Sequence, residues 1–333
     1  MNSGDSRNIS NENNSRISIR SGNNSKNGSG ISSRKDRKNN SNNRSLKNLL
    51  TGLLFLSPAL IILIVFVFYP MFRTVYLSFF LTDSKGDPVF FNGLENYTEL
   101  FQSPEFLLSL QATFLFVLYT VVPTIALALF LAVLANEKLR GVQLFRVLFS
   151  STLGVSAAAA AVIWLFIFDP SIGLLNNLFG KLGLSSIGWM TDPNWALLSI
   201  SMTTIWMHLG FNFIVLLGGL QSIPEDLYES ATIDGAGFFQ QFRKITVPML
   251  SPTLFFVTVV GVINAFQSFG QIDIMTKGGP AGATNLIVYS IYRDAFVNDY
   301  IGSASAQAII LFLLVLIFTL LQFKFGERKV HYQ

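Results

Sequence analysis

The chain has 333 residues, of which 51% are hydrophobic and only 13% are charged, with a formal net charge of +4 and no cysteine. This composition excludes an ordinary soluble domain and predicts a polytopic membrane protein. Without cysteines the chain has no disulfide framework and no thiol nucleophile, and its two histidines lie far apart in sequence, so we expect no metal site.

Residues 1–47 consist mainly of Asn, Ser, Gly, Arg and Lys and hold no apolar residues placed to bury a core. We expect a disordered cytoplasmic tail. Its basic run at 34–38 could bind nucleic acid or anionic lipid, but a solvated tail that orients the first helix is the simpler interpretation, and we expect no nucleic-acid partner.

Six apolar segments are long enough to cross the roughly 30 Å of bilayer hydrocarbon as helices. They are predicted at 49–72, 109–135, 144–168, 196–220, 253–273 and 303–323. The first should bend near Pro70, whose ring removes a backbone hydrogen bond, and continue amphipathically to Phe80. Since a helix satisfies its own backbone groups in lipid, the predicted fold class is all-α, a polytopic bundle of six transmembrane helices.

Lysine and arginine indicate the orientation of this bundle. With the N-terminus inside, the outer loops hold only five of the 23 basic residues, Arg73, Lys85, Lys181, Lys277 and Arg293. Basic residues accumulate on the cytoplasmic side, so both termini are predicted to be cytoplasmic. We therefore expect four parts: a tail over 1–47, a first helix and outer connector over 48–105, a transmembrane core over 106–325 with a cytoplasmic loop at 221–252, and a tail over 326–333.

The loop at 221–252 has the signals of two short helices. Ser-Ile-Pro-Glu at 222–225 fits a capping box at the start of the first helix. That helix should end at Gly235, because glycine permits a left-handed backbone, and the second should begin near Gly237 and end at Pro248. An apolar stripe on the second helix, which packs on its own bundle or meets another protein, consists of Phe238, Phe242 and Ile245.

The same loop carries a spacing of Glu-Ala-Ala, three residues, Gly, nine residues, then Ile-x-x-Pro. Glu229, Ala231, Gly235, Ile245 and Pro248 fall on this pattern, and Ser230 departs from it by one hydroxyl. The pattern resembles the loop of permease subunits of bacterial binding-protein-dependent ABC importers. Further similarity to the sugar and sn-glycerol-3-phosphate branch, over about 46–333, lies at 93–97, 231–236, 278–284 and 322–333.

The resemblance implies a type I ABC importer permease fold in the bacterial plasma membrane. It implies import of sn-glycerol-3-phosphate or a sugar or polyol by alternating access, in an assembly with a second permease subunit, two cytoplasmic ATPase subunits and an extracytoplasmic substrate-binding protein. The chain would then be no enzyme and bind no cofactor, because ATP and Mg²⁺ belong to the partner ATPase. The role of coupling to that ATPase falls on Glu229, Ser230, Ala231, Asp234, Gly235, Ile245 and Pro248.

Two absences support an external energy source. Near the middle of the six predicted spans there is no Asp, Glu, Lys or Arg of the kind that an ion-coupled transporter needs. A phosphate-binding Gly-x-x-x-x-Gly-Lys-Ser/Thr loop is also missing from the sequence. The alternatives are a permease of the same family for a different oligosaccharide or glucosyl-polyol, and a membrane assembly or receptor protein that transports nothing.

Polar residues in the fourth and fifth spans are candidates for the solute path. Asn264, Gln267, Ser268 and Gln271 stand at i, i+3, i+4 and i+7 and would share one helix face, and Trp206 and Asn212 lie in the fourth span. These side chains either line a path by hydrogen bonding to solute or join neighbouring helices, and the sequence leaves both open. His208 is expected to be a buried neutral imidazole. A phosphate-bearing solute would need cations, which only Arg73, Lys277 and Arg293 near the outer mouth offer.

Overall fold

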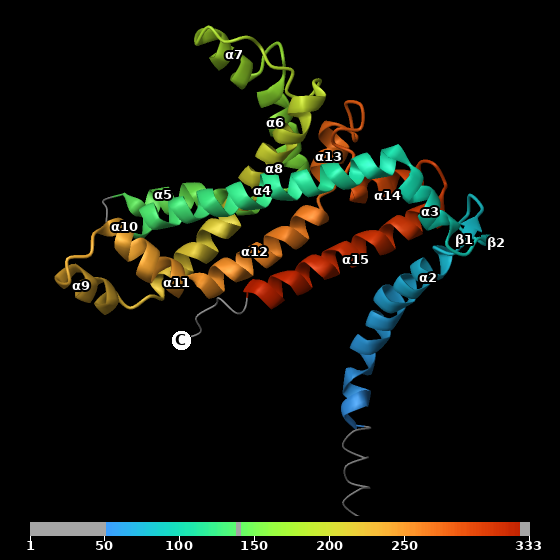
Figure 1. Cartoon of the computed structure of the whole chain (residues 1–333), viewed down its shortest axis with the longest axis horizontal. Coiled ribbons are helices and arrows are strands. Elements are labelled where there is room, and N and C mark those ends of the chain that lie inside the picture. The colour runs from blue at the N-terminus through green and yellow to red at the C-terminus, as the bar shows by residue number, and fades with distance from the viewer. Residues whose placement is uncertain (1–50, 138–140, 327–333) are drawn as a thin grey trace, which may run out of the picture. The chain divides into compact units, whose positions relative to one another are not determined.

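The structure is a computed structural model that describes residues 51–137 and 141–326 (Figure 1). The predicted tail over 1–47, two of the basic residues counted for orientation at 138–140, and nearly all of the C-terminal tail lie outside the described residues. Contacts divide the chain into two units, of which one ends at Phe66 and the other begins at Val67.

The first predicted span is an apolar helix over Thr51–Leu77. It contains a π-helical turn, η1, at Ile64–Phe68, followed by α2 at Tyr69–Leu77. Pro70 lacks an N–H group and its ring crowds the preceding turn, and a π turn is one way in which a helix accommodates that ring. The predicted bend near Pro70 corresponds in the structure to a π turn just before the proline, and the helix ends at Leu77 and does not continue to Phe80.

Phe80 instead begins a β-hairpin of β1, Phe80–Thr82, and β2, Pro88–Phe91. The helix α3, Glu95–Gln102, follows directly, and the side-chain amide of Asn96 donates to the carbonyl oxygens of Ser78 (2.9 Å) and Phe80 (3.1 Å). The predicted all-α class is right for the bundle, and this two-stranded ribbon in the outer connector is the addition that the sequence analysis missed.

The longest helices are α4, Pro104–Asn136, and α8, Pro193–Gln221, which pack along each other. Buried Ala128, Ala132 and Ala135 stand at intervals of four and three residues on α4, and buried Phe213 and Leu216 of α8 belong to the same apolar cluster. Small residues on one helix allow the backbone of its neighbour to approach closely. The helix α15, Ile301–Gly326, is the predicted last span.

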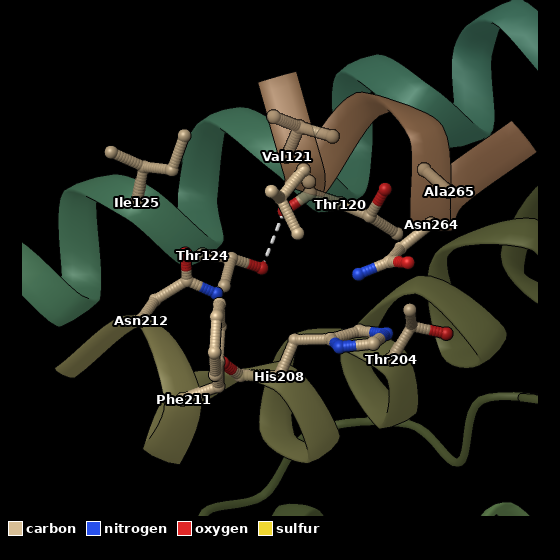
Figure 2. A pocket seen from close by; sticks show the side chains of 12 residues that line it. Thr120, Val121, Thr124, Ile125, Thr204, His208, Phe211, Asn212, Asn264 and Ala265 are labelled. Carbon is tan, nitrogen blue, oxygen red and sulfur yellow. Dashed lines mark hydrogen bonds between the residues drawn. The ribbon is translucent and has the colours of Figure 1, made fainter. Parts of the chain in front are cut away.

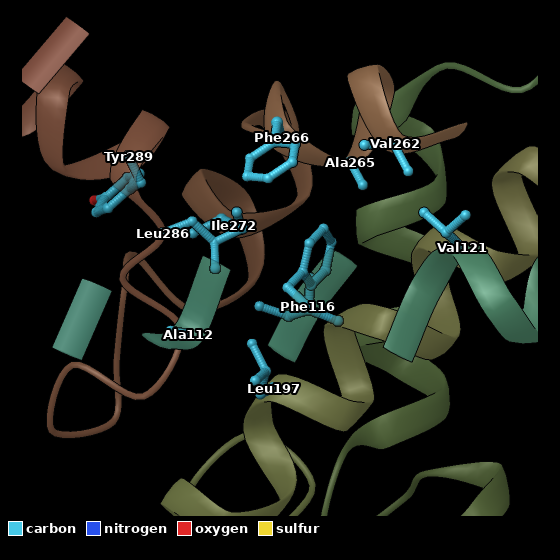
Figure 3. Close-up of a cluster of buried hydrophobic side chains, with 11 residues drawn as sticks. Ala112, Phe116, Val121, Leu197, Val262, Ala265, Phe266, Ile272, Leu286 and Tyr289 are labelled. Carbon is cyan, nitrogen blue, oxygen red and sulfur yellow. The ribbon is translucent and has the colours of Figure 1, made fainter. Parts of the chain in front are cut away.

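A second apolar cluster joins α4 and α8 to the chain after residue 251. Phe116 of α4 and Phe266 of α12, Ser251–Phe266, are almost completely buried, with Ile272 of α13, Gly270–Met275, and Leu286 beside them (Figure 3). Ring contacts extend the cluster to α14, Ile287–Phe296, where Tyr289 stacks on Phe269 at 6.0 Å between ring centroids. This cluster fixes the position of the polar residues considered below.

Neither of the predicted spans 144–168 and 253–273 is one continuous helix. The first comprises α5, Val142–Ser150, a 3₁₀ turn at Ser151–Gly154 (η2), and α6, Ala157–Phe168, with a bend of 108°. Ser156 caps α6 by accepting from the Ala159 N–H, a local bond that favours a new helix start. Among the described residues four helices are long enough to span a membrane, or up to six if each bent pair is one span.

The fifth predicted span, 253–273, is interrupted once, after Phe266, and the segment that precedes it is bent. Before α12 come α10, Phe238–Gln241, a π turn at Phe242–Thr246 (η3), and α11, Val247–Met249, and this segment meets α12 at 66°. After α12 the helix stops at Phe266 and resumes at Gly270. The remaining described helices are α7, Leu174–Lys181, and α9, Glu225–Ile233.

The bend at η2 depends on a close approach to Gly210 of α8. The Gly210 N–H donates to Thr152 Oγ1 at 3.0 Å, and a Cβ on Gly210 would lie 2.5 Å from that oxygen and 3.0 Å from the Phe149 carbonyl oxygen. We expect Gly210→Ala to lower the free energy of unfolding by about 1–3 kcal/mol, as overpacking does. Thermal unfolding in detergent measures this. Gly218→Ala is the control, because nothing lies within 4 Å of a Cβ there, and equal stability of the two variants would contradict the prediction.

Candidate functional site: the loop at 221–252 and a polar pocket between helices

The first loop helix ends in a Schellman motif. The Gly235 N–H donates to the Thr232 carbonyl oxygen (3.0 Å) and the Ala236 N–H to the Ala231 carbonyl oxygen (2.8 Å). Gly235 has φ +80°, the left-handed conformation that this motif requires. The predicted helix end at Asp234-Gly235 is confirmed, and so is a second helix start next to Gly237, the N-cap of α10.

Side chains hold the two loop helices together across this turn. Gln241 Nε2 of α10 donates to Thr232 Oγ1 and to the Ala236 carbonyl oxygen, both at 3.0 Å. Farther back, the hydroxyls of Tyr228 and Thr246 share a hydrogen bond of 3.0 Å. The loop is therefore one braced unit. No local pattern in the sequence predicts these contacts, because they join residues that are 9 and 18 positions apart.

Two local predictions for the loop are wrong. Ser222 does not cap α9: its hydroxyl donates to the Gly219 carbonyl oxygen at 2.7 Å, and Pro224 is the N-cap without a side-chain cap bond. Ser222 instead ends α8, whose free carbonyl groups compete for its hydroxyl. Pro248 does not end the second helix, because Val247 is helical (φ −64°, ψ −44°) and the chain continues to Met249. A proline in the first turn of a helical segment needs no N–H partner, and a π turn precedes it.

The predicted coupling residues divide into two groups by burial. Glu229, Ser230, Asp234 and Gly235 are exposed around the end of α9, and Ala231 is half-buried beside them. Ile245 and Pro248 are half-buried, and Ile245 packs on the cluster that holds Leu250. The residues around the end of α9 therefore form a surface, and Ile245 and Pro248 attach that surface to the bundle.

Large apolar side chains are exposed on the same loop. Ile233 is 86% exposed, Phe238 67% and Phe239 74%. The predicted stripe of Phe238, Phe242 and Ile245 is thus split, because its last two members are half-buried and only Phe238 points outward. Three large apolar side chains exposed within seven residues of a hydrophilic loop form an apolar patch, and such patches mark protein contacts.

A cavity of about 640 Å³ lies between this loop and the ends of the long helices. Tyr228, Gln241 and Thr246 line it from the loop, and Arg146 and Asn136 line it from the bundle. The Arg146 guanidinium donates to the Ala135 carbonyl oxygen at 3.2 and 2.8 Å through Nε and Nη2, so it satisfies a free carbonyl at the end of α4.

A second, much smaller pocket lies between α4, α8 and α12 (Figure 2). Its accessible space is about 20 Å³, enough for one water molecule. Hydroxyl, amide and imidazole groups face it from three helices, and the polar residues that line it are Thr120, Thr124, Thr204, His208, Asn212 and Asn264. None of its lining side chains is acidic or strongly basic. The pocket suits hydrogen bonding to an uncharged polar group.

Of the six residues predicted to line the solute path, only two line the small pocket. Asn212 and Asn264 line the pocket, and the Asn212 amide donates to the His208 carbonyl oxygen at 2.8 Å. Trp206 lies outside the lining and makes an edge contact with Trp164, 6.2 Å between ring centroids. The three threonines of the lining were missed, although Thr120 and Thr124 stand four residues apart on one helix face.

The predicted single face of Asn264, Gln267, Ser268 and Gln271 is wrong, because the helix breaks between Phe266 and Gly270. Asn264 and Gln267 are exposed, whereas Ser268 and Gln271 are buried. The Gln271 amide donates to Thr204 Oγ1 (3.1 Å) and Ser268 Oγ (3.0 Å). For Gln271 and Ser268 the structure favours the role of joining helices, so among these four residues Asn264 and Gln267 stay candidates for solute contact.

One of the three outer cations is already paired. Arg293 of α14 forms an ion pair with Glu105 at the start of α4. Arg73 and Lys277 are exposed, with Lys277 in a turn at φ +50°. The chain therefore has less positive charge available for an anionic solute than its sequence indicated.

Comparison with known proteins shows which family has this sequence and architecture. The model of the family described as "Binding-protein-dependent transport system inner membrane component" matches residues 100–331. The chain belongs to this family. It is 39% identical over 280 residues to the sn-glycerol-3-phosphate transport system permease protein UgpA of Brucella abortus biovar 1 (strain 9-941), a match that covers 83% of the chain and 94% of the relative. The protein of that name from Agrobacterium fabrum (strain C58 / ATCC 33970) is 36% identical, with 86% and 97% covered.

Solved structures show the same fold. A chain of a bacterial ABC transporter involved in the import of the acidic polysaccharide alginate matches with a TM-score of 0.74 and 24% identity, over 86% of this chain and 98% of that one. The predicted type I ABC importer permease fold is confirmed. The family member is a multi-pass protein of the bacterial plasma membrane and a permease subunit of a binding-protein-dependent importer.

Proposed function

We propose that this family member moves sn-glycerol-3-phosphate into the cell by alternating access. It does so with a second permease subunit, two cytoplasmic ATPase subunits and an extracytoplasmic substrate-binding protein. The observation that carries the proposal is the braced loop with an exposed apolar patch at Ile233, Phe238 and Phe239. Such a patch on a cytoplasmic loop is stabilised when another protein covers it.

The loop has the mechanical properties that coupling needs. Gln241 bridges the turn, and Tyr228 and Thr246 join the helices behind it, so a push on the tip of α9 moves α10 and α11 with it. Ile245 and Pro248 then transmit the motion to the bundle, because both lie where the loop enters α12. A rigid-body tilt of this kind is how packed helices convert a local event into an opening.

In this proposal the contact surface for the ATPase consists of Glu229, Ser230, Ala231, Asp234 and Gly235. ATP and Mg²⁺ bind to that subunit. A solved alginate ABC transporter in complex with an alginate pentasaccharide-bound periplasmic protein, 23% identical to this chain with a TM-score of 0.74, has a binding protein as partner. That arrangement supports the binding-protein partner proposed here.

The relatives named as sn-glycerol-3-phosphate permeases support the substrate. The small pocket has room for only one water molecule in this conformation, but the side chains around it are of the kind that bind hydroxyl groups. Thr120, Thr204, Asn212 and Asn264 offer donors and acceptors that match hydroxyl groups. The lining carries no positive charge, so the phosphate needs the second permease subunit to supply cations. The substrate-binding protein selects the solute before this chain receives it.

Uptake into sealed vesicles tests the proposal. Vesicles with all subunits and enclosed ATP and Mg²⁺ should accumulate radiolabelled sn-glycerol-3-phosphate when the binding protein is added outside. Omission of the ATPase, of ATP or of this chain should abolish accumulation. Accumulation of an oligosaccharide in place of sn-glycerol-3-phosphate would refute the substrate, and uptake that persists without the ATPase would refute the coupling.

A further inference from the structure

The hairpin β1–β2 exposes an unusual amount of apolar surface. Val89 is 70% exposed, Phe90 64% and Phe91 63%, and Leu81 on the paired strand is also exposed. Successive residues of a strand point to opposite faces. Exposed apolar side chains of β2 therefore lie on both faces of the ribbon, whereas Phe80 and Thr82 of β1 are half-buried.

This surface is held firmly in place. The Gly302 N–H of α15 donates to Thr82 Oγ1 at 3.1 Å, and a Cβ on Gly302 would lie only 2.3 Å from the Phe80 carbonyl oxygen. Asn96 of α3 donates to the same Phe80 carbonyl oxygen, and the Phe80 ring packs edge-on against Phe91 with 5.2 Å between ring centroids. The hairpin is therefore attached to α15 and α3, and its apolar side chains are exposed in this fixed position.

The ribbon follows closely after the end of the first apolar span. It begins three residues after Leu77, where the first span ends, and Arg73 is exposed one turn before that end. The connection at 83–87 carries exposed Lys85 and Asp87, so the ribbon is apolar over β2 and polar at its tip. Arginine at the end of a span and aromatic residues beside it are typical of the membrane interface.

We propose that the hairpin inserts Val89, Phe90 and Phe91 into the headgroup region of the outer leaflet and anchors the start of α15 there. Two apolar faces favour lipid over a protein partner, because a docking protein would cover one face and leave the other in water. The depth is limited to the interface, since a two-stranded ribbon has unpaired N–H and C=O groups along both edges that hydrocarbon cannot satisfy. The inference depends on the membrane location and not on the solute or the ATPase.

Nitroxide labels on single cysteines test this proposal, because the chain has no native cysteine. The protein is labelled at F90C, and separately at V89C and K85C, and reconstituted with its co-purifying partners in phosphatidylcholine nanodiscs. The unsubstituted complex gives the background. We expect the labels at 89 and 90 to be several-fold more accessible to oxygen than to a water-soluble nickel chelate, and the label at 85 to show the opposite order.

Other results would overturn the anchor. High nickel accessibility at 89 and 90 would place the ribbon in water, and low accessibility to both reagents would mean that a protein covers it. Comparison with and without the substrate-binding protein separates that partner from the second permease. If both F90C and V89C failed to assemble, these side chains would be packed against protein, which also contradicts the proposal.

Discussion

Replacing Gly235 with valine is expected to leave the chain inserted and assembled but to reduce ATP-driven uptake about tenfold or more. Gly235 closes the Schellman motif at φ +80°, and a side chain in the left-handed region costs about 1–2 kcal/mol, with β-branched residues most affected. No atom lies within 4 Å of a Cβ at this position, so the effect comes from the backbone alone. ATP hydrolysis and uptake, measured on the same vesicles, should show hydrolysis without matching transport.

The loop offers a matched control two residues away. Gly237 also has open space around its Cβ position, but its φ of −72° suits any residue. Gly237→Val should therefore keep most of the uptake, and Gly235→Asn should restore much of it, because asparagine tolerates the left-handed conformation. Equal loss in both valine variants would show that added bulk on the loop surface is responsible, and wild-type uptake in Gly235→Val would count against coupling through this turn.

Asn264→Leu is expected to raise the solute concentration for half-maximal uptake about tenfold while leaving thermal stability unchanged. Asn264 is exposed, lines the small pocket, and its side chain faces Thr204 and His208 across it (Figure 2). Removing an amide that bonds to solute leaves a polar group of the solute unpaired, a loss of about 1–3 kcal/mol. Uptake kinetics and thermal unfolding of the same preparation measure the two quantities.

Gln271→Leu is the comparison that distinguishes a path residue from one that joins helices. Gln271 is buried and donates to Thr204 and Ser268, so its loss should reduce stability by about 1–3 kcal/mol. The uptake that remains should keep its original concentration dependence. If Gln271→Leu changed that dependence and Asn264→Leu only destabilised the protein, the assignment of the two side chains would be reversed.

Local sequence was sufficient for much of the fold. The lengths of the apolar segments predicted the long helices α4, α8 and α15, because a span must be both apolar and about 20 residues long. Glycine at 235 predicted the end of α9, since only the local backbone decides where a left-handed residue is needed. The spacing from Glu229 to Pro248 identified the family, and the comparison confirms it.

Two features could not be predicted from the sequence: which of two competing hydrogen-bond partners a side chain takes, and which residues distant in sequence pack together. The Ser222 hydroxyl could bond either to the end of α8 or to the start of α9, and in the structure it donates to the Gly219 carbonyl oxygen at the end of α8. The break after Phe266 follows from packing of Phe266 and Ile272 into one cluster, which a straight apolar helix could not achieve. Hydropathy is the same for a bent and a straight span, so both bends were invisible.

The sequence by itself determined the medium, the number of apolar segments and the position of the turn at Gly235, because these depend on residues close together in the chain. Only the tertiary structure decided which polar groups meet. The small pocket combines Thr120, His208 and Asn264 from three helices, and Gln271 is removed from it by a bond to Thr204, 67 residues away. Contacts of that range depend on how helices cross and break, which no periodicity in the sequence records.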